Sequence, residues 1–301
     1  MDPFLAAGVS LAPLEGGWSG ETFLAEAGGE RTVVRIFADP RHHPAAAEIG
    51  GAVLRLVRGL VPVPQVKEVR RASAESGMPA LLITEFVPGV RGDLLLPTLD
   101  DDGLEVIGAE AGRVAATLAG MPTLRPGVWA DGDLRIEPRE LGGLAVWVEQ
   151  HLAELPTWPA EDVDRMLAVA ESAQELLDTV DRSCVVHSDL NPKNLLLDPD
   201  TLTVAAVVDW EFSHSGHPFT DLGNLLRFDR LPAWVDGVVG AWCEARGVDR
   251  DDAVALARAA DLYALVELAG RAGANPVADR ADRQLREVAR TGDLHAAVGG
   301  T

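Results

Sequence analysis

The sequence has 301 residues, of which 47% are hydrophobic and 24% charged, and 47 acidic against 26 basic side chains give a formal net charge of −21. This composition is typical of a globular protein that is long enough to bury a substantial core, and so acidic a surface is a poor partner for nucleic acid or an anionic membrane. No run of about 18 uncharged apolar residues occurs, so the sequence indicates no membrane-spanning helix.

The two cysteines, Cys184 and Cys243, are too few for a disulfide framework. The first residues, Met1 to Leu5, lack the basic start of a signal peptide. We therefore expect reduced thiols and a cytoplasmic protein.

Predicted strands dominate the first 90 residues. Short apolar runs at 11–14 and 23–26 flank a glycine-rich turn at 16–20, and the β-branched run at 32–37 alternates with period two. From residue 45 the apolar spacing becomes helical and continues to residue 60, where Pro62 ends it. Two further strands are expected, at 65–69 and 81–86.

Beyond Pro88-Gly89 the helical period dominates, and it predicts helices at 103–119, 143–153, 161–181, 231–246, 250–271 and 277–290. Three short apolar runs interrupt these helices, at 185–186, 195–197 and 204–208, and they favour strands. Residues 187–194 then form the loop between the first two of these strands, and Asp209 follows the third. Loops held by rigid strands commonly carry catalytic residues.

An aspartate, an asparagine and a second aspartate give this region its chemistry. Asn194 follows Asp189 by five residues, and Asp209 stands at the end of the third strand. One carboxylate can orient an attacking hydroxyl, while an amide oxygen and a second carboxylate can hold magnesium on nucleotide phosphates. The pattern is typical of a phosphoryl-transfer site.

The segment from His187 to Asn194, followed by Asp209, resembles the catalytic loop and metal-binding aspartate of the protein-kinase-like fold. More narrowly, it resembles the aminoglycoside phosphotransferase family. Asp209-Trp210-Glu211 replaces the Asp-Phe-Gly of protein kinases, residues 216–222 resemble that family's Gly-x-Pro-x-x-Asp-Leu segment, and no Ala-Pro-Glu activation segment follows.

This resemblance implies an α+β, protein-kinase-like fold of two lobes. Residues 1–87 would form a small β-rich nucleotide-binding lobe, residues 84–88 the hinge, and residues 88–301 the larger helical lobe for catalysis and substrate binding.

The resemblance also implies a role for each residue of the loop. Asp189 would orient the substrate hydroxyl and accept its proton, and Asn194 and Asp209 would bind Mg²⁺. Support for this loop is expected from His187 by packing, from Asp221 by accepting backbone N–H bonds, and from Lys193, which either reaches the γ-phosphate or remains solvated.

The glycine-rich turn resembles the nucleotide loop of the family. It contains Gly17, Ser19 and Gly20, whose small side chains would let backbone N–H groups approach the phosphates of ATP or GTP. A plain hairpin turn is the alternative interpretation of this segment.

Arg35 stands where the family usually has the phosphate-binding lysine, a departure that keeps a fixed cation but changes its geometry. Glu48, on the predicted helix, is its expected ion-pair partner. At the hinge, the carbonyl of Glu85 and the N–H of Val87 are expected to bond the adenine.

The acidic balance would attract a cationic substrate, because each ammonium group that leaves water needs a charged partner. The alternative interpretation is that the acidity only keeps the protein soluble. The family acts mainly on small hydroxylated molecules, and many members act on cationic antibiotics. The sequence therefore predicts an ATP-dependent resistance kinase for an aminoglycoside or a tuberactinomycin-type peptide such as capreomycin. The candidate substrate contacts are Glu211, Asp229, Asp261 and Glu267.

Two alternatives remain open at this point. One is a metabolic kinase of the same superfamily, acting on a sugar, an amino alcohol or a homoserine-like metabolite. The other is a nucleotide-binding pseudoenzyme. The arginine at position 35 supports this alternative, whereas the intact set of Asp189, Asn194 and Asp209 argues against it.

Overall fold

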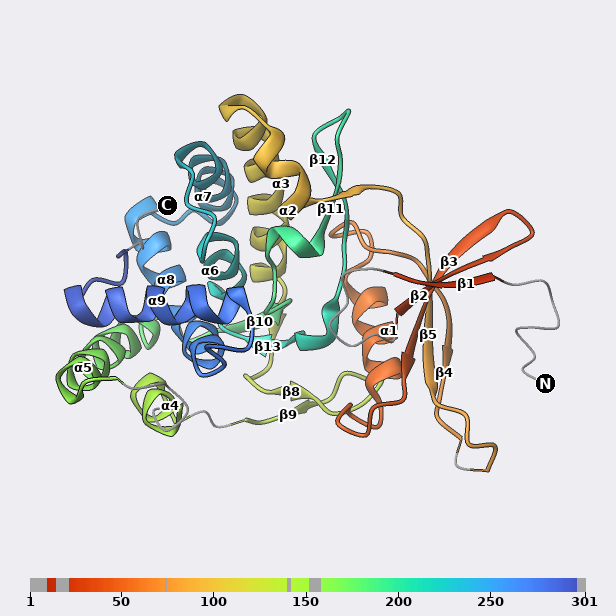
Figure 1. Ribbon diagram of the computed structural model, residues 1–301, viewed down its shortest axis with the longest axis horizontal. Helices are drawn as coiled ribbons and strands as arrows, with labels where there is room; N and C mark the ends of the chain where they lie inside the picture. Colours follow the sequence, from red (N-terminus) through yellow and green to blue (C-terminus); the bar gives the residue numbers. More distant parts are fainter. Residues whose placement is uncertain (1–9, 15–21, 74, 140–141, 152–157, 297–301) are drawn as a thin grey trace. The chain divides into compact units, whose positions relative to one another are not determined.

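The computed structural model describes residues 10–14, 22–73, 75–139, 142–151 and 158–296 (Figure 1). The chain divides into two compact units. We call the first the sheet unit; it comprises Met1–Leu99, Val128–Glu137 and Asn191–His214. The second, the helical unit, comprises Asp100–Gly127, Pro138–Leu190 and Ser215–Thr301. Both units are built from separate chain segments, and a lobe boundary after residue 87 stays a prediction.

The sheet unit contains a five-stranded antiparallel sheet in the order β1-β2-β3-β5-β4. Its strands are β1 (Ser10–Pro13), β2 (Thr22–Ala27), β3 (Glu30–Phe37), β5 (Ala80–Glu85) and β4 (Val66–Arg70). The register places Arg35 of β3 between Thr22 and Leu82. Period-two alternation predicts these strands because a strand presents successive side chains to opposite faces.

Helix α1 (Ala46–Val57) packs against β4 and β5 (Figure 1). Its buried stripe includes Val53, Leu54 and Val57. The sequence predicts a helix to residue 60, but the structure ends it at Val57, and Arg58 already has extended backbone angles. Gly59, two residues beyond Val57, has a φ of 84°, a left-handed conformation that glycine adopts readily and that a helix cannot continue through.

A second, three-stranded sheet in this unit carries the loop residues of interest. β11 (Leu195–Asp198) pairs antiparallel with β12 (Thr203–Val207) on one side and with β6 (Val90–Arg91) on the other. The 3-10 turn η3 (Pro192–Asn194) precedes β11, and η4 (Trp210–Phe212) follows β12. The remaining elements of this unit are α2 (Gly92–Leu95), η2 (Leu96–Thr98) and the hairpin of β8 (Val128–Trp129) and β9 (Ile136–Glu137).

The helical unit is built around the pair α3 (Asp101–Ala119) and α7 (Pro232–Arg246). These helices approach closely because a glycine of α3 faces the backbone of α7: a Cβ on Gly112 would lie 2.2 Å from the carbonyl oxygen of Val238. Asp100 caps α3 by accepting a hydrogen bond from the N–H of Gly103.

Each helix that the sequence predicts for this unit is present, and the further ones are α4 (Leu144–His151), α5 (Ala160–Leu177), α8 (Arg250–Ala269) and α9 (Pro276–Thr291). Strand β10 (Ser183–Val186) pairs with β7 (Pro122–Thr123), and β13 (His214–Gly216) begins at the last residue of the sheet unit. None of the described helices combines the length and apolarity needed to cross a membrane.

The sequence does not predict α6 (Thr220–Leu226). Residues 221–226 are all buried, so this helix has no polar face and shows no amphipathic period. α6 packs against α8 within the helical unit.

Candidate active site

In the sheet unit, the β11–β12 hairpin brings Asn194 close to the residue that precedes Asp209. Leu195 and Val207 are paired, and the N–H of Val208 donates to the carbonyl of Asn194 at 3.0 Å. Asn194 ends η3, and 3% of its surface is exposed. The amide and the carboxylate that the sequence singles out are therefore presented by the same end of one hairpin.

Asp209 adopts a left-handed backbone conformation, with φ 64° and ψ 57°. Aspartate tolerates this region better than most residues, and such positions are concentrated at functional sites. The next residue, Trp210, is 6% exposed, and its indole N–H donates to the carbonyl of Val207 at 3.0 Å. The buried indole thus fixes the turn that presents the Asp209 carboxylate.

Arg35 binds two carboxylates of this turn. Its Nη1 donates to Oδ1 of Asp209 at 2.8 Å, and its Nη2 donates to Oε2 of Glu211. The Arg35 side chain is 16% exposed. A guanidinium fork can reach two separate acceptors in fixed directions, whereas the ammonium of a lysine is a point charge.

The prediction that Arg35 pairs with Glu48 is wrong. Glu48 instead accepts from Nε of Arg71 at 2.8 Å. Both terminal nitrogens of Arg35 are already occupied by the carboxylates of Asp209 and Glu211, which lie two residues apart in the chain.

The carboxylates of Asp209 and Glu211 both lie beside Arg35, and their negative charges repel each other. Burial raises the pKa of Glu211, the nearby negative charge of Asp209 raises it further, and Arg35 acts in the opposite direction. A cation that joined this cluster would therefore stabilise the ionised form of Glu211.

The donor set fits magnesium. Mg²⁺ prefers oxygen ligands and usually takes one or two carboxylates, with water and substrate phosphates completing its shell. Asn194 and Asp209 offer an amide oxygen and a carboxylate of this kind. In the part of the chain that the structure describes, no three His, Cys, Asp or Glu residues are grouped to enclose a metal, as a zinc site would require.

In the helical unit, Asp221 ties down the loop that contains Asp189. Its Oδ2 accepts from the N–H of His187 at 2.9 Å, and its Oδ1 accepts from the N–H of Ser188 at 2.8 Å. Asp221 is 2% exposed and His187 is fully buried. Ser188 has a φ of 68°, a strained conformation that these two hydrogen bonds help to hold.

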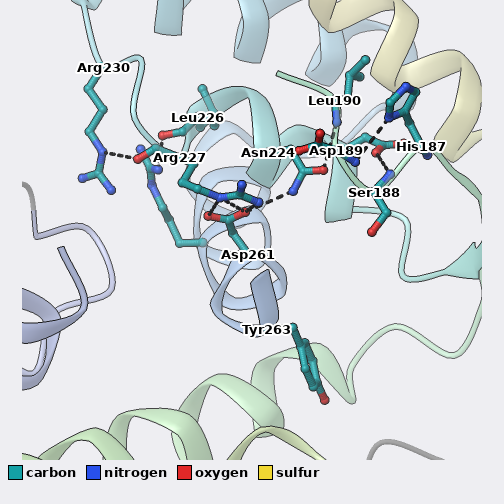
Figure 2. A network of polar contacts seen from close by, with 12 residues as sticks. His187, Ser188, Asp189, Leu190, Asn224, Leu226, Arg227, Arg230, Asp261 and Tyr263 are labelled. Atoms are coloured by element: carbon teal, nitrogen blue, oxygen red, sulfur yellow. Dashed lines mark hydrogen bonds and ion pairs between the residues drawn. The ribbon is translucent and has the colours of Figure 1, made fainter. Parts of the chain in front are cut away.

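The next two N–H groups also have side-chain acceptors. The N–H of Asp189 donates to Nδ1 of His187 at 3.3 Å, and the N–H of Leu190 donates to Oδ1 of Asn224 at 3.2 Å (Figure 2). The backbone on both sides of the half-buried Asp189 is therefore held by buried polar side chains.

The family model described as the phosphotransferase enzyme family matches residues 10–256. The chain belongs to this family. The predicted family, the α+β kinase-like fold and the assignment as a phosphotransferase are confirmed.

Solved structures share the fold of this chain over most of its length. The GDP and kanamycin complex of APH(2″)-IIIa is 17% identical, covers 94% of either chain and has a TM-score of 0.68. A thermostable mutant of the aminoglycoside phosphotransferase APH(4)-Ia, in a ternary complex with ADP and hygromycin B, is 16% identical, covers 96% of this chain and 97% of its own, and has a TM-score of 0.63. At this identity the likeness concerns the fold.

Among curated proteins, the chain resembles part of much longer proteins. Acyl-CoA dehydrogenase family member 10 of Mus musculus is 30% identical over 168 residues, which are 54% of this chain and 15% of the relative. Family member 11 of Mus musculus is 30% identical over 94 residues, which are 25% of this chain and 12% of the relative. The matched region thus spans less than a sixth of these relatives.

The predicted substrate carboxylates have different surroundings in the two units. Asp261 is 4% exposed, and its oxygens accept from Arg227 inside the helical unit. Glu267 is exposed and pairs with Arg271 on the same helix, and Asp229 is half-buried. Glu211 belongs to the Arg35 cluster of the sheet unit. Asp261 is therefore placed as a partner of Arg227, away from the protein surface.

The other predicted residues are placed as follows. Lys193 is half-buried in η3, and Val87 lies two residues beyond the end of β5. Glu85 ends β5, and its Oε1 accepts from the N–H of Gln65 at 2.9 Å. Gly17, Ser19 and Gly20 lie outside the described residues.

Sequence reasoning missed Asn224 and Arg227. Asn224 is an asparagine in the interior of a buried helix, and a buried amide needs hydrogen-bond partners. That requirement could have identified Asn224 as a structurally important residue. Its hydrogen-bond partners, however, lie on other elements and cannot be predicted from sequence spacing.

Proposed function

We propose that this phosphotransferase transfers the γ-phosphoryl group of ATP or GTP to a hydroxyl of a small cationic molecule, and that the acceptor is an antibiotic such as an aminoglycoside or a tuberactinomycin-type peptide. The observation that carries the proposal is the hairpin that presents Asn194 and Asp209, with Arg35 bound to Asp209 at 2.8 Å. An amide, a carboxylate and a fixed cation are the groups that phosphoryl transfer requires.

In the proposed mechanism Asp189 accepts a hydrogen bond from the acceptor hydroxyl and takes its proton as the oxygen attacks the γ-phosphorus. The bond between that phosphorus and the oxygen that bridges it to the β-phosphate breaks, and the nucleoside diphosphate leaves. Asn194 and Asp209 would hold magnesium, which neutralises phosphate charge when bound. Arg35 would exchange its contacts with Asp209 and Glu211 for phosphate oxygens, because a fork that fits two carboxylate oxygens also fits two phosphate oxygens.

The nucleotide assignment is supported by the complexes of two proteins that share the fold, one with GDP and kanamycin and the other with ADP and hygromycin B. The substrate charge is supported by the net charge of −21. We propose that exposed carboxylates of the helical unit, such as Glu267, contact the cationic substrate, and that Asp261 does not.

The test is the release of ADP or GDP from purified protein with magnesium, measured over a panel of aminoglycosides, tuberactinomycin-type peptides, sugars, amino alcohols and homoserine. Asp189→Asn is the matched control, because it keeps the size of the side chain but cannot accept the proton. Transfer to a polycation by wild type but not by Asp189→Asn supports the proposal. Preference for a neutral sugar or a small amino alcohol would replace the antibiotic by a metabolite, and nucleotide binding without transfer to any acceptor would refute the kinase activity.

A further inference from the structure

A chain of buried polar contacts runs from the loop that contains Asp189 to helix α8 (Figure 2). Asn224 forms its first link. Its Oδ1 accepts from the N–H of Leu190, and its Nδ2 donates to Oδ1 of Asp261 at 3.2 Å. Asn224 is 2% exposed, so both ends of its amide are satisfied inside the helical unit.

Asp261 also binds Arg227 through two nitrogens. Nε of Arg227 donates to both carboxylate oxygens at 3.0 Å, and Nη2 donates to Oδ1 at 2.7 Å. The two side chains are 7% and 6% exposed. Taking two charges out of water is costly, and an apolar pair of similar volume often gives equal or greater stability. Stability alone therefore does not account for an ion pair at this position.

The charge of Arg227 is kept by the carboxylates around it. Burial opposes this charge, but the negative charge of Asp261 and, more weakly, those of Asp189 and Glu267 raise the pKa of Arg227. Asp261 therefore faces a guanidinium that stays charged inside the helical unit.

The elements that carry these side chains are packed too closely to shift independently. A Cβ on Gly223, in α6, would lie 2.4 Å from the carbonyl oxygen of Ala257 in α8. Asn224 and Arg227 on α6 therefore have a fixed relation to Asp261 on α8, and the loop is held against a rigid support.

We propose that Asp261 is a positioning residue for the predicted base: its ion pair with Arg227 fixes its carboxylate, and through Asn224 that carboxylate holds the backbone at Leu190, directly after Asp189. This inference rests on the proposed function, in which Asp189 accepts a proton. It assigns to Asp261 a task unlike the substrate contact that the sequence suggests.

The decisive variant removes both charges together. Arg227→Met/Asp261→Leu replaces the ion pair by apolar side chains, so that neither partner is left behind as an unpaired buried charge. Asn224 then loses the acceptor of its Nδ2 group. Asn224→Ala is the second variant, because it breaks the link to Leu190 while it keeps the ion pair. Val238→Ala, a cavity in the core on α7, is the control for a general loss of stability.

Two readouts separate positioning from stability. The first is backbone amide exchange of the 187–190 segment, measured without substrate. We expect exchange at Leu190 to accelerate by about tenfold or more in the double variant and in Asn224→Ala, while His187 and Ser188, held by Asp221, change less. The second is steady-state kinetics. We expect kcat to fall about 10- to 100-fold, as displacement of a catalytic group does, with the Kd of the nucleotide within about twofold of wild type.

Val238→Ala should lower the melting temperature and leave kcat at the assay temperature within about twofold of wild type. Unchanged exchange at Leu190 in both variants would overturn the inference, as would a loss of kcat no greater than that of Val238→Ala. The exchange measurement needs no acceptor. A wild-type protein without transferase activity would therefore refute the proposed function, while exchange would still decide whether Asp261 holds the loop.

Discussion

Replacing Arg35 by alanine tests the cation that departs from the family pattern. This side chain makes an ion pair of 2.8 Å with Asp209 and a second one with Glu211, and it is 16% exposed. Its removal leaves two neighbouring carboxylates without their shared cation. In the proposed mechanism the same change also removes the fixed positive charge beside the phosphates.

The expected magnitude follows from the number and kind of contacts. Removing one preorganised donor to developing charge typically costs about 2–4 kcal/mol, and about 1.4 kcal/mol corresponds to tenfold in rate. We therefore expect Arg35→Ala to lose about 30- to 900-fold in kcat/KM for the nucleotide. Arg35→Lys keeps the charge but offers no planar fork, so we expect it to lose less than about tenfold.

The assay is nucleoside diphosphate release at varied nucleotide concentration, with the acceptor saturating. Arg41→Ala is the matched control, because Arg41 also pairs with an aspartate in the sheet unit but is 89% exposed. An exposed pair contributes little, so this variant should remain within about twofold of wild type. If Arg35→Ala were as active as Arg41→Ala, Arg35 would have no part in the reaction.

Three further predictions concern other residues. Asp189→Ala should lower kcat by about 10²–10⁴-fold with nucleotide affinity nearly unchanged, since the side chain serves the acceptor hydroxyl; retention of a tenth of the activity would exclude it as the base. Asp209→Asn should weaken both Mg-nucleotide binding and turnover, and a calorimetric titration in which neither changes would remove Asp209 from the metal site. Burial lowers the pKa of His217 from 6.5 to about 4, so the unfolded chain binds the extra proton first and stability falls as pH decreases from about 6.5 toward 4. Urea midpoints of His217→Gln should consequently fall less over this range than those of wild type, and parallel curves would refute the assignment.

Local periodicity predicts most of the elements because it reports burial. Side chains alternate between two faces from residue 32 to 37, with Val33, Arg35 and Phe37 on one face, and this alternation predicts β3. The long amphipathic helices are predicted in the same way from their apolar stripes. The same reasoning fails for α6, where every residue from Asp221 to Leu226 is buried and the pattern has no polar phase. A helix of seven residues surrounded by others owes its formation to packing.

The features of the candidate site also divide into those that the sequence predicts and those that depend on the folded structure. The spacing of Asp189, Asn194 and Asp209 can be recognised in the sequence because these residues lie on a short, continuous strand–loop–strand segment. Ion pairing cannot be recognised in this way. Arg35 has two carboxylates within reach more than 170 residues away, and the contact partners of Asp261 depend on how α6 and α8 pack.

Substrate charge provides the last prediction, because it connects the acidity of the chain with recognition. If the charge of −21 serves to attract a polycation, the KM of that substrate should rise about three- to tenfold between low and physiological salt. Exposed carboxylates such as Glu267 are screened beyond about 8–10 Å at physiological ionic strength, whereas contacts made inside the bound complex are screened less. kcat should therefore change little, and the KM of the anionic nucleotide should respond weakly or in the opposite direction. The control is a neutral hydroxylated acceptor, for which KM should not depend on salt. An equally flat response for a confirmed polycationic substrate would show that the acidic surface has no part in recognition.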